Sequence, residues 1–355
     1  MTIDTRFPGG NLTVLGEDEG GFTVEREMRD STGDWFYWAF RIRGAAGKTL
    51  TFRFPSKNRV GYHGAAISTD LSEWRWPGGK FASDAGEGFT YTFAPDENEV
   101  YLAHDMLYPA SRLARLTALP GMRLEELCIS RRGRSVPLLR LGEGSRKILL
   151  TARHHACEST GSYVLEGVLS AFAEKPLPDT EIICVPFVDY DGVCDGDQGK
   201  NRAPHDHNRD YAPESPSVHP SCRAIRSLAE REPLMLAFDF HSPYHLGGRH
   251  DKVFFVHGNH AVSPKITEFG KLLEKHLTPE AMPYSTENDI LPGVEWNSEK
   301  STTCARYLLK KTTVRLAVTL ETTYFGEPSQ RVTQPRLTAL GASFARAIEA
   351  YVSTL

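Results

Sequence analysis

Residues 147–159 read Lys-Ile-Leu-Leu-Thr-Ala-Arg-His-His-Ala-Cys-Glu-Ser. The apolar run that opens this stretch is typical of a buried strand, and the apolar residues of 161–172 recur at helical spacing. A strand-to-helix turn in an α/β sheet presents its side chains at the carboxyl end of the strand, where such folds bind ligands. His155 and Glu158 lie on this turn and form a ligand pair that suits zinc. Alone the pattern is weak, because it is common by chance.

Strand-like and helical runs alternate through the rest of the chain from residue 116 onward. This alternation predicts an α/β domain over residues 116–355, with a mixed, largely parallel sheet flanked by helices. We expect strands at 138–141, 147–153, 181–188, 234–240, 252–257 and 313–320, and helices at 160–173, 221–231, 264–277 and 335–351. A further helix is expected at 111–119, across the predicted start of this domain, and a polar loop at 189–215.

Residues 1–115 read as all-β. Short runs alternate apolar and polar residues and are separated by clusters of Gly, Pro, Asp and Asn, a pattern that predicts a β-sandwich domain. Aromatic residues are dense at 35–38, 74 and 76, and large core side chains explain them better than a platform for carbohydrate or peptide. The expected strands include 22–26, 35–43, 49–54, 88–93 and 99–104.

Composition is that of an ordinary globular chain, with 40% hydrophobic and 24% charged residues among 355. The net charge of −4 gives no reason to expect nucleic acid or an anionic membrane as a partner. No signal peptide and no membrane-spanning apolar run is evident. The six cysteines lack any regular spacing, so we expect reduced thiols in a cytoplasmic protein. The sequence leaves open whether the chain forms a homo-oligomer.

Two further strands end in residues that can complete a catalytic centre. His241 directly follows the run 236–240, and a strand parallel to 147–153 would bring it to the edge that carries His155 and Glu158. Two histidines and one glutamate leave a fourth position on zinc open for water, as in catalytic sites. Glu321 ends the run at 313–320 and could serve as general base beside that water. Ten of the thirteen histidines lie between His154 and His260, which favours a metal or acid–base site in this region.

The polar loop offers groups that could bind substrate and orient a ligand. Asn208 and Arg209 pair an amide donor with a planar guanidinium, a combination that suits a substrate carboxylate. Asp206 has the chemistry to accept the free ring N–H of a metal-binding histidine and so to fix its tautomer.

This ordered set of motifs resembles the zinc metallocarboxypeptidase family. The motifs are His155-x-x-Glu158, Asp191-Gly, Asp206-x-Asn208-Arg209, His241-Ser and Thr319-Leu-Glu321. The resemblance is closer to the cytosolic carboxypeptidase (deglutamylase-like) branch, because it extends over nearly the whole chain. The matching stretches are 7–12, 34–38, 52–57 and 100–104 in the β-sandwich region, and Cys128, Arg153 and 316–325 in the second domain.

The resemblance implies zinc as cofactor and the C-terminus of a peptide or protein as substrate. It assigns His155, Glu158 and His241 as zinc ligands and Glu321 as the base. It assigns Asn208 and Arg209 to the terminal carboxylate. The family also uses an arginine upstream of the Asn-Arg pair to polarise the scissile carbonyl. Arg202 is our choice for that role, with Lys200 as second candidate.

Two departures from the family pattern affect the substrate pocket. No tyrosine lies in 297–303, where the family has a residue that caps the substrate, and Tyr307 and Tyr284 are both open as substitutes. Arg306 lies fifteen residues before Glu321, where the family forms the floor of the pocket for the substrate's last side chain. A guanidinium there would favour an acidic side chain.

The sequence therefore predicts a zinc carboxypeptidase that removes a C-terminal, acidic amino acid from peptides. One alternative keeps the same chemistry in an amidohydrolase that acts on N-acyl amino acids or cell-wall peptides. The other is a non-catalytic protein that binds peptide or glycan. A serine hydrolase is disfavoured, because the chain contains no Gly-x-Ser-x-Gly motif.

Overall fold

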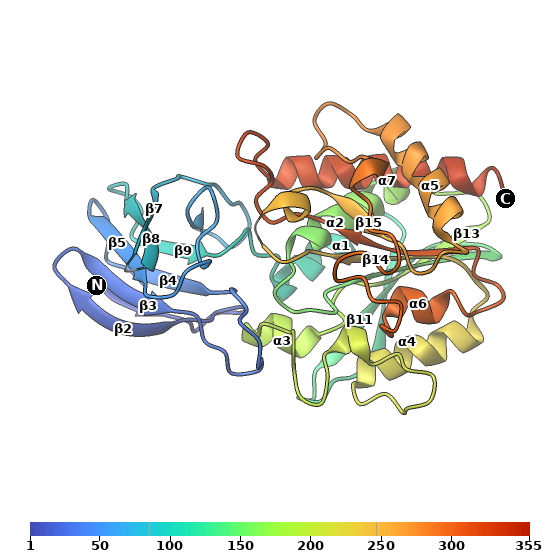
Figure 1. Ribbon diagram of the computed structural model, residues 1–355, viewed down its shortest axis with the longest axis horizontal. Helices are drawn as coiled ribbons and strands as arrows, with labels where there is room; N and C mark the ends of the chain where they lie inside the picture. Colours follow the sequence, from blue (N-terminus) through green and yellow to red (C-terminus); the bar gives the residue numbers. More distant parts are fainter. Residues whose placement is uncertain (85, 246) are drawn as a thin grey trace.

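The computed structural model describes residues 1–84, 86–245 and 247–355. It has a smaller N-terminal lobe made of strands and a larger lobe in which helices cover a central sheet (Figure 1). Both the β-sandwich and the α/β domain predicted from the sequence are confirmed. Among the described residues, none of the helices combines the length and apolar character that crossing a membrane requires.

Two sheets form the N-terminal lobe and pack face to face over an aromatic core. One sheet has the strand order β1 (Thr2–Asp4), β4 (Ala39–Arg43), β9 (Glu99–Ala103), β6 (Ala66–Ser68). The other has the order β2 (Thr13–Asp18), β3 (Gly21–Glu25), β5 (Thr49–Phe54), β8 (Gly86–Thr92), β7 (Lys80–Ser83). Trp38 is fully buried and stacks on Phe89 with ring centroids 5.7 Å apart, so this aromatic belongs to the core, as predicted.

The strand predicted over 35–43 is shorter than expected, because β4 begins only at Ala39. Two of the residues before it, Trp35 and Phe36, pack with the larger lobe instead of the sandwich. Phe36 is fully buried. Its ring centroid lies 4.1 Å from that of His245, on which it stacks, and 5.3 Å from that of Tyr324. The contact between the lobes therefore interrupts the alternating pattern.

The segment that follows β9 also packs with the larger lobe, because Tyr108 and Leu116 belong to the apolar core of that lobe. The domain boundary predicted at residue 115 therefore lies inside this segment.

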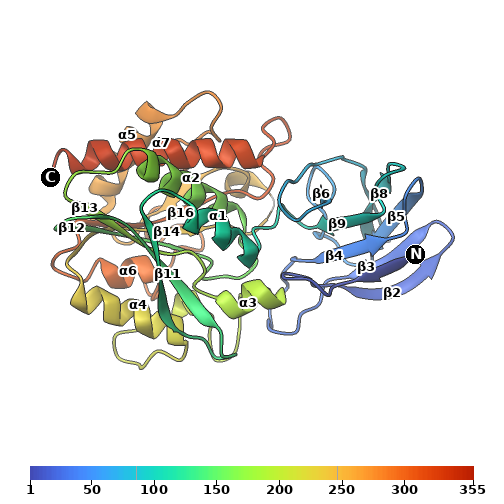
Figure 2. The same ribbon diagram turned by 180° about the vertical axis from the view of Figure 1, so that it is seen from behind.

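A seven-stranded sheet organises the larger lobe (Figure 2). Its order is β10 (Met122–Ile129), β11 (Ser135–Glu143), β13 (Thr180–Val185), β12 (Arg146–Ala152), β14 (Leu234–His241), β16 (Leu316–Glu321), β15 (Phe254–Val256). The four middle strands are parallel, and β10, β11 and β15 run antiparallel to their neighbours. β10 was not expected from the sequence, because this edge strand is mostly exposed and rich in charged residues.

Helices cover both faces of this sheet. One face carries α2 (Thr160–Glu174), α5 (Ser263–His276) and α7 (Gln334–Val352), and the other carries α4 (Pro220–Arg231) and α6 (Cys304–Leu308) (Figure 1). Two short helices, α1 (Leu113–Thr117) and α3 (Tyr190–Asp195), lie toward the N-terminal lobe. Single 3₁₀ turns occupy Ala110–Arg112, His207–Arg209, Gly248–Asp251 and Thr286–Asn288. The long helices match the predicted ranges, whereas α3 and α6 were too short to show a periodic pattern.

Candidate metal centre

Three neighbouring parallel strands bring the predicted metal ligands and the predicted general base to one edge of the sheet. His155 and Glu158 lie on the turn between β12 and α2, and His241 ends β14, the next strand in the sheet. Glu321 ends β16, where it pairs in register with His241. The carboxyl ends of parallel strands meet at the same edge. For this reason the structure brings together four residues that are far apart in the sequence.

The side chains of His155, Glu158 and His241 converge on a single point. Nδ1 of His155 lies 2.9 Å from Oε1 of Glu158, and Nδ1 of His241 lies 2.7 Å from Oε2 of the same carboxylate. One ligand atom from each of the three residues lies within 4.8 Å of the others, and all three side chains are buried. Two imidazoles and one carboxylate in this arrangement can hold a divalent metal and leave a position open to water or substrate.

The outer nitrogens of both imidazoles face aspartates. Nε2 of His155 lies 3.4 Å from Oδ1 of Asp206, and Nε2 of His241 lies 2.8 Å from Oδ2 of Asp239. Asp239 accepts the outer N–H of His241, and Asp206 lies beside the outer nitrogen of His155, so both rings present Nδ1 to Glu158. Burial lowers the pKa of His241, but the charges of Asp239 and Glu158 outweigh this effect and hold it well above its ordinary value.

Asp239 is a functional candidate that was not predicted from the sequence. It lies in β14 two residues before His241, so both side chains point to the same face of the strand. Its other carboxylate oxygen accepts hydrogen bonds from His154 at 2.9 Å and from Thr151 at 2.7 Å. A carboxylate inside an otherwise apolar strand was the available signal, since such a charge is costly without partners.

Glu321 has the features of a proton acceptor. Its side chain is buried, and among the described residues no group forms a hydrogen bond to Oε2. Burial raises the pKa of the carboxyl to about 7, against the attraction of His241. A carboxyl group with a pKa near neutrality can both take up and release a proton under physiological conditions.

Lys200 is the cationic residue that reaches this centre. Its Nζ lies 2.5 Å from Oε1 of Glu158 and 4.4 Å from the centre of the Trp35 ring, which comes from the N-terminal lobe. Burial lowers the pKa of Lys200, but the negative charge of Glu158 outweighs it and the pKa is raised. Lys200 therefore carries a positive charge beside the metal-binding carboxylate.

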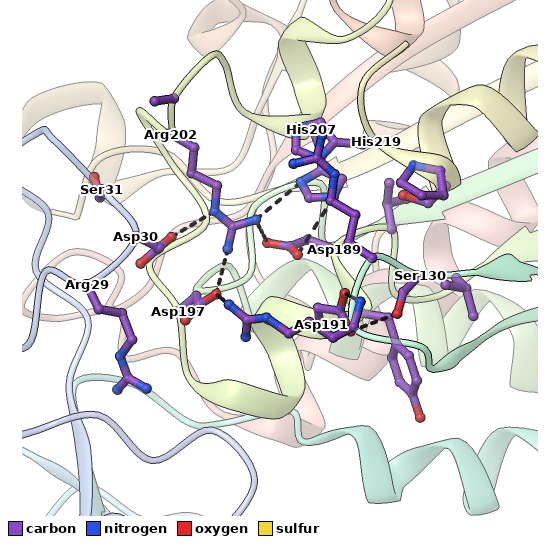
Figure 3. Close-up of a pocket in the computed structure, with 18 of the residues that line it drawn as sticks. Arg29, Asp30, Ser31, Ser130, Asp189, Asp191, Asp197, Arg202, His207 and His219 are labelled. Carbon is purple, nitrogen blue, oxygen red and sulfur yellow. Dashed lines mark hydrogen bonds and ion pairs between the residues drawn. The ribbon is translucent and has the colours of Figure 1, made fainter.

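Arg202 points away from the centre, so its position does not fit the role in oxyanion stabilisation predicted for it. Its guanidinium lies in a second cavity, between the two lobes (Figure 3). There Nε is 2.8 Å from Asp30, and the two terminal nitrogens lie 2.7 Å from Asp189 and 3.0 Å from Asp197. Three carboxylates hold this side chain, and it links the N-terminal lobe to the larger one.

A pocket of about 310 Å³ opens beside the metal-binding residues. Asn208, Arg209 and Arg306, the residues predicted to contact substrate, all line it. The side-chain oxygen of Asn208 accepts a hydrogen bond from the backbone N–H of Cys304 at 3.0 Å, which fixes the direction of its amide group. The remaining lining includes Trp35, His155, Lys200, Asn201, Asp206, His241, Tyr244, His250, Trp296, Thr303, Thr319 and Glu321.

Arg306 is held by the loop that precedes it. It donates hydrogen bonds to the backbone carbonyls of Ser298 and Ser301 and, at 2.8 Å, to Oδ1 of Asn297. Burial lowers the pKa of Arg306. These contacts leave Nε and one N–H of the guanidinium available to a ligand.

Neither tyrosine considered as a substrate cap lines the pocket. The hydroxyl of Tyr307 donates to Glu230 at 3.1 Å, and that of Tyr284 donates to Asp289 at 3.0 Å. The aromatic side chains that do line it are Trp35, Tyr244 and Trp296. Trp35 was grouped with core residues in the sequence analysis, yet it is a pocket residue, because the segment before β4 crosses to the larger lobe.

Comparison with known proteins supplies independent information. Residues 3–104 match the family model described as the cytosolic carboxypeptidase N-terminal domain. Cytosolic carboxypeptidase 2 of Macaca fascicularis is 31% identical over 300 residues, which cover 68% of this chain and 35% of that protein. The Danio rerio protein of the same name is 26% identical over 298 residues, or 68% of this chain and 41% of that protein. The chain thus spans well under half the length of these relatives.

Solved structures share the fold over the full length of the chain. A metallo-carboxypeptidase from Burkholderia cenocepacia superimposes with a TM-score of 0.80 at 20% identity, covering 99% of both chains. One from Pseudomonas aeruginosa, solved in complex with (2-guanidinoethylmercapto)succinic acid, gives a TM-score of 0.77 at 20% identity, again over 99% of both chains. The arrangement of the two lobes is therefore common to these proteins.

Proposed function

The chain belongs to the metallocarboxypeptidase family, and on this premise we propose that it is a zinc-dependent carboxypeptidase that hydrolyses the last peptide bond of a peptide. The observation that carries the proposal is the convergence of His155, Glu158 and His241 beside Glu321, at the mouth of a pocket that also contains a carboxylate-binding pair. A metal site, a base and a group that selects a free C-terminus are what this reaction requires.

The donor set fits zinc. Two Nδ1 atoms and one carboxylate face each other in a buried site, and Asp206 and Asp239 orient the two rings. When bound there, zinc supplies Lewis acidity and lowers the pKa of water from 15.7 to about 7. Removal of the N–H protons from the two Nδ1 atoms is part of metal binding, which makes affinity fall as the pH is lowered.

Glu321 is the general base and then the general acid of the proposed reaction. Its carboxylate takes a proton from the attacking water, holds it on the buried carboxyl, and gives it to the nitrogen of the departing amino acid. Water thus adds hydroxyl to the carbonyl carbon and hydrogen to the amine as the C–N bond breaks. The pKa of about 7 for Glu321 suits both transfers.

Asn208 and Arg209 bind the terminal carboxylate of the substrate. A guanidinium and an amide donor form directional, charge-assisted hydrogen bonds with a carboxylate. The test of the function is a pair of peptides that differ only in a free or an amidated C-terminus. We expect release of the last amino acid from the free peptide alone. Cleavage of both at similar rates, or of neither by zinc-loaded protein, would contradict the proposal.

Lys200 stabilises the negative charge that develops on the carbonyl oxygen. We expect Lys200→Ala to lower kcat by about 100- to 1,000-fold, the usual effect of removing an oxyanion donor, and Lys200→Arg to restore part of the rate. The measurement is steady-state hydrolysis of one peptide. Lys175, which is 77% exposed, provides the control, and Lys175→Ala should match the wild type. A wild-type kcat in Lys200→Ala would rule out this role.

Arg306 selects an acidic side chain at the last position of the substrate. A charge-assisted hydrogen bond contributes about 1.5–3 kcal/mol, or roughly 10- to 150-fold in rate. We therefore expect Arg306→Ala to reduce the ratio of kcat/KM for Glu-terminated over Leu-terminated peptides by about that factor. The exposed Arg315 supplies the matched control. An unchanged ratio in Arg306→Ala would show that another residue sets specificity.

A further inference from the structure

A second group of metal-binding side chains lies outside the pocket, on the loop that leads from α3 to α4. His205, Asp210 and His219 each place one ligand atom within 4.8 Å of the others. None of the three lines the active-site pocket. His219 instead borders the cavity between the lobes, which has a volume of about 490 Å³ (Figure 3). The group is therefore separate from the catalytic centre.

Asp210 is the centre of this group. Its Oδ1 lies 2.8 Å from Nε2 of His205, and its two oxygens accept the backbone N–H groups of Val218 at 2.9 Å and His219 at 2.8 Å. The Asp210 side chain is 2% exposed, whereas that of His205 is 32% exposed. The carboxylate is thus fixed and buried, and His205 leaves a path from solvent.

The tautomer of His219 is set by a backbone carbonyl. Its Nε2 lies 3.0 Å from the carbonyl oxygen of His205 and donates its proton there, so Nδ1 carries a free lone pair. Among the described residues no group forms a hydrogen bond to this Nδ1. The ring plane is held by stacking on His207, with centroids 3.7 Å apart. An oriented imidazole whose second nitrogen donates to a carbonyl is the usual state of a metal ligand.

We propose that His205, Asp210 and His219 bind a second divalent cation of the zinc class. Two imidazole nitrogens and one carboxylate oxygen match the preferences of zinc, and a fourth position is left for water. A bound ion would replace the proton that His205 shares with Asp210 and would use the free lone pair of His219.

The ion would fasten the loop that binds substrate. Asn208 and Arg209 lie between two of its ligands, His205 and Asp210, and the third ligand, His219, precedes α4. A cation that joins these three points restricts the conformations of the segment. Binding of the ion does not depend on the proposed peptidase activity, so the two claims can fail separately.

The test is the zinc content of full-length variants after dialysis against a zinc buffer, measured by mass spectrometry. We expect His205→Ala to hold one equivalent fewer per chain than the wild type, and His155→Ala to lose a different equivalent, so that the double variant loses both. His260→Ala is the matched control, because His260 also pairs with a carboxylate, Glu299 at 3.1 Å, but with no third ligand in the part of the chain that the structure describes. It should keep the wild-type content.

A second measurement, the change in Tm on adding zinc, separates loss of the site from misfolding of a variant. In the His155→Ala background, zinc should still raise Tm, and Asp210→Asn, which keeps the shape of the side chain, should remove this rise. Equal zinc content in the wild type and His205→Ala, or no rise in Tm in the His155→Ala background, would overturn the second site and leave the catalytic one untouched. Loss of one zinc equivalent in His205→Ala but none in His155→Ala would support the second site and contradict the catalytic one.

Discussion

Replacing Glu321 with glutamine is expected to lower kcat by about 100- to 10,000-fold without releasing the metal. Glutamine preserves the size of the side chain but cannot accept a proton from water. Glu321 is buried and its Oε2 has no hydrogen-bond partner among the described residues, so an amide can occupy the same space. Since Glu321 is not among the three convergent ligands, the zinc content should stay unchanged.

The measurement for Glu321→Gln is kcat together with metal content on the same preparation. Glu268→Gln, an exposed position on α5, is the control and should match the wild type in both. A Glu321→Gln enzyme that retains most of its turnover would contradict the assignment of the base. Loss of zinc along with turnover would instead move Glu321 into the ligand set.

Replacing His155 with alanine is expected to remove the catalytic metal and to lower turnover by on the order of 1,000-fold or more. The variant leaves Glu158 and His241 as ligands, too few for the metal to stay bound against dialysis. His155 lies on the turn after β12, outside the strands, so its loss should disturb the sheet little.

Three quantities measured together test this prediction: zinc content, kcat, and thermal unfolding of the dialysed protein. His260→Ala again serves as the control, because its side chain is 72% exposed. Wild-type turnover in a His155→Ala preparation that has lost one equivalent of zinc would contradict a metal-dependent reaction. Retention of the full wild-type zinc content would show that other residues hold the catalytic metal.

The part of the site that follows strand ends could be predicted from the sequence. Apolar runs ending at residue 153, at His241 and at Glu321 mark strands of a parallel sheet, and parallel strands present their carboxyl ends together. The register then brings His241 opposite Glu321. No contact between distant loops had to be known for this inference.

The choice between Lys200 and Arg202 could not be made from the sequence. Both lie in an irregular loop where no periodicity tells which way a side chain points, and Gly196 and Gly199 turn the backbone through positive φ. The direction of Arg202 is set partly by Asp30, a residue of the other lobe. Such a contact depends on how the lobes pack, which no local pattern encodes.

Some residues that orient the ligands or line the pocket could not be predicted from the sequence either. Asp239 sits inside a run that predicts only a buried strand, and its role follows from the ring direction of His241. Trp35 reads as one of several core aromatics, and only the crossing of its segment to the larger lobe brings it to Lys200. Both depend on long-range packing.

Peptide hydrolysis by this protein should require one metal ion held by His155, Glu158 and His241. The most direct measurement starts from metal-free protein carrying His205→Ala, so that the second proposed site cannot contribute. Zinc is added in steps while release of the C-terminal residue is followed. We expect no release without zinc, and a rate of release that rises linearly with added zinc up to one equivalent per chain. Full release from the metal-free protein, or none after zinc has bound, would contradict it.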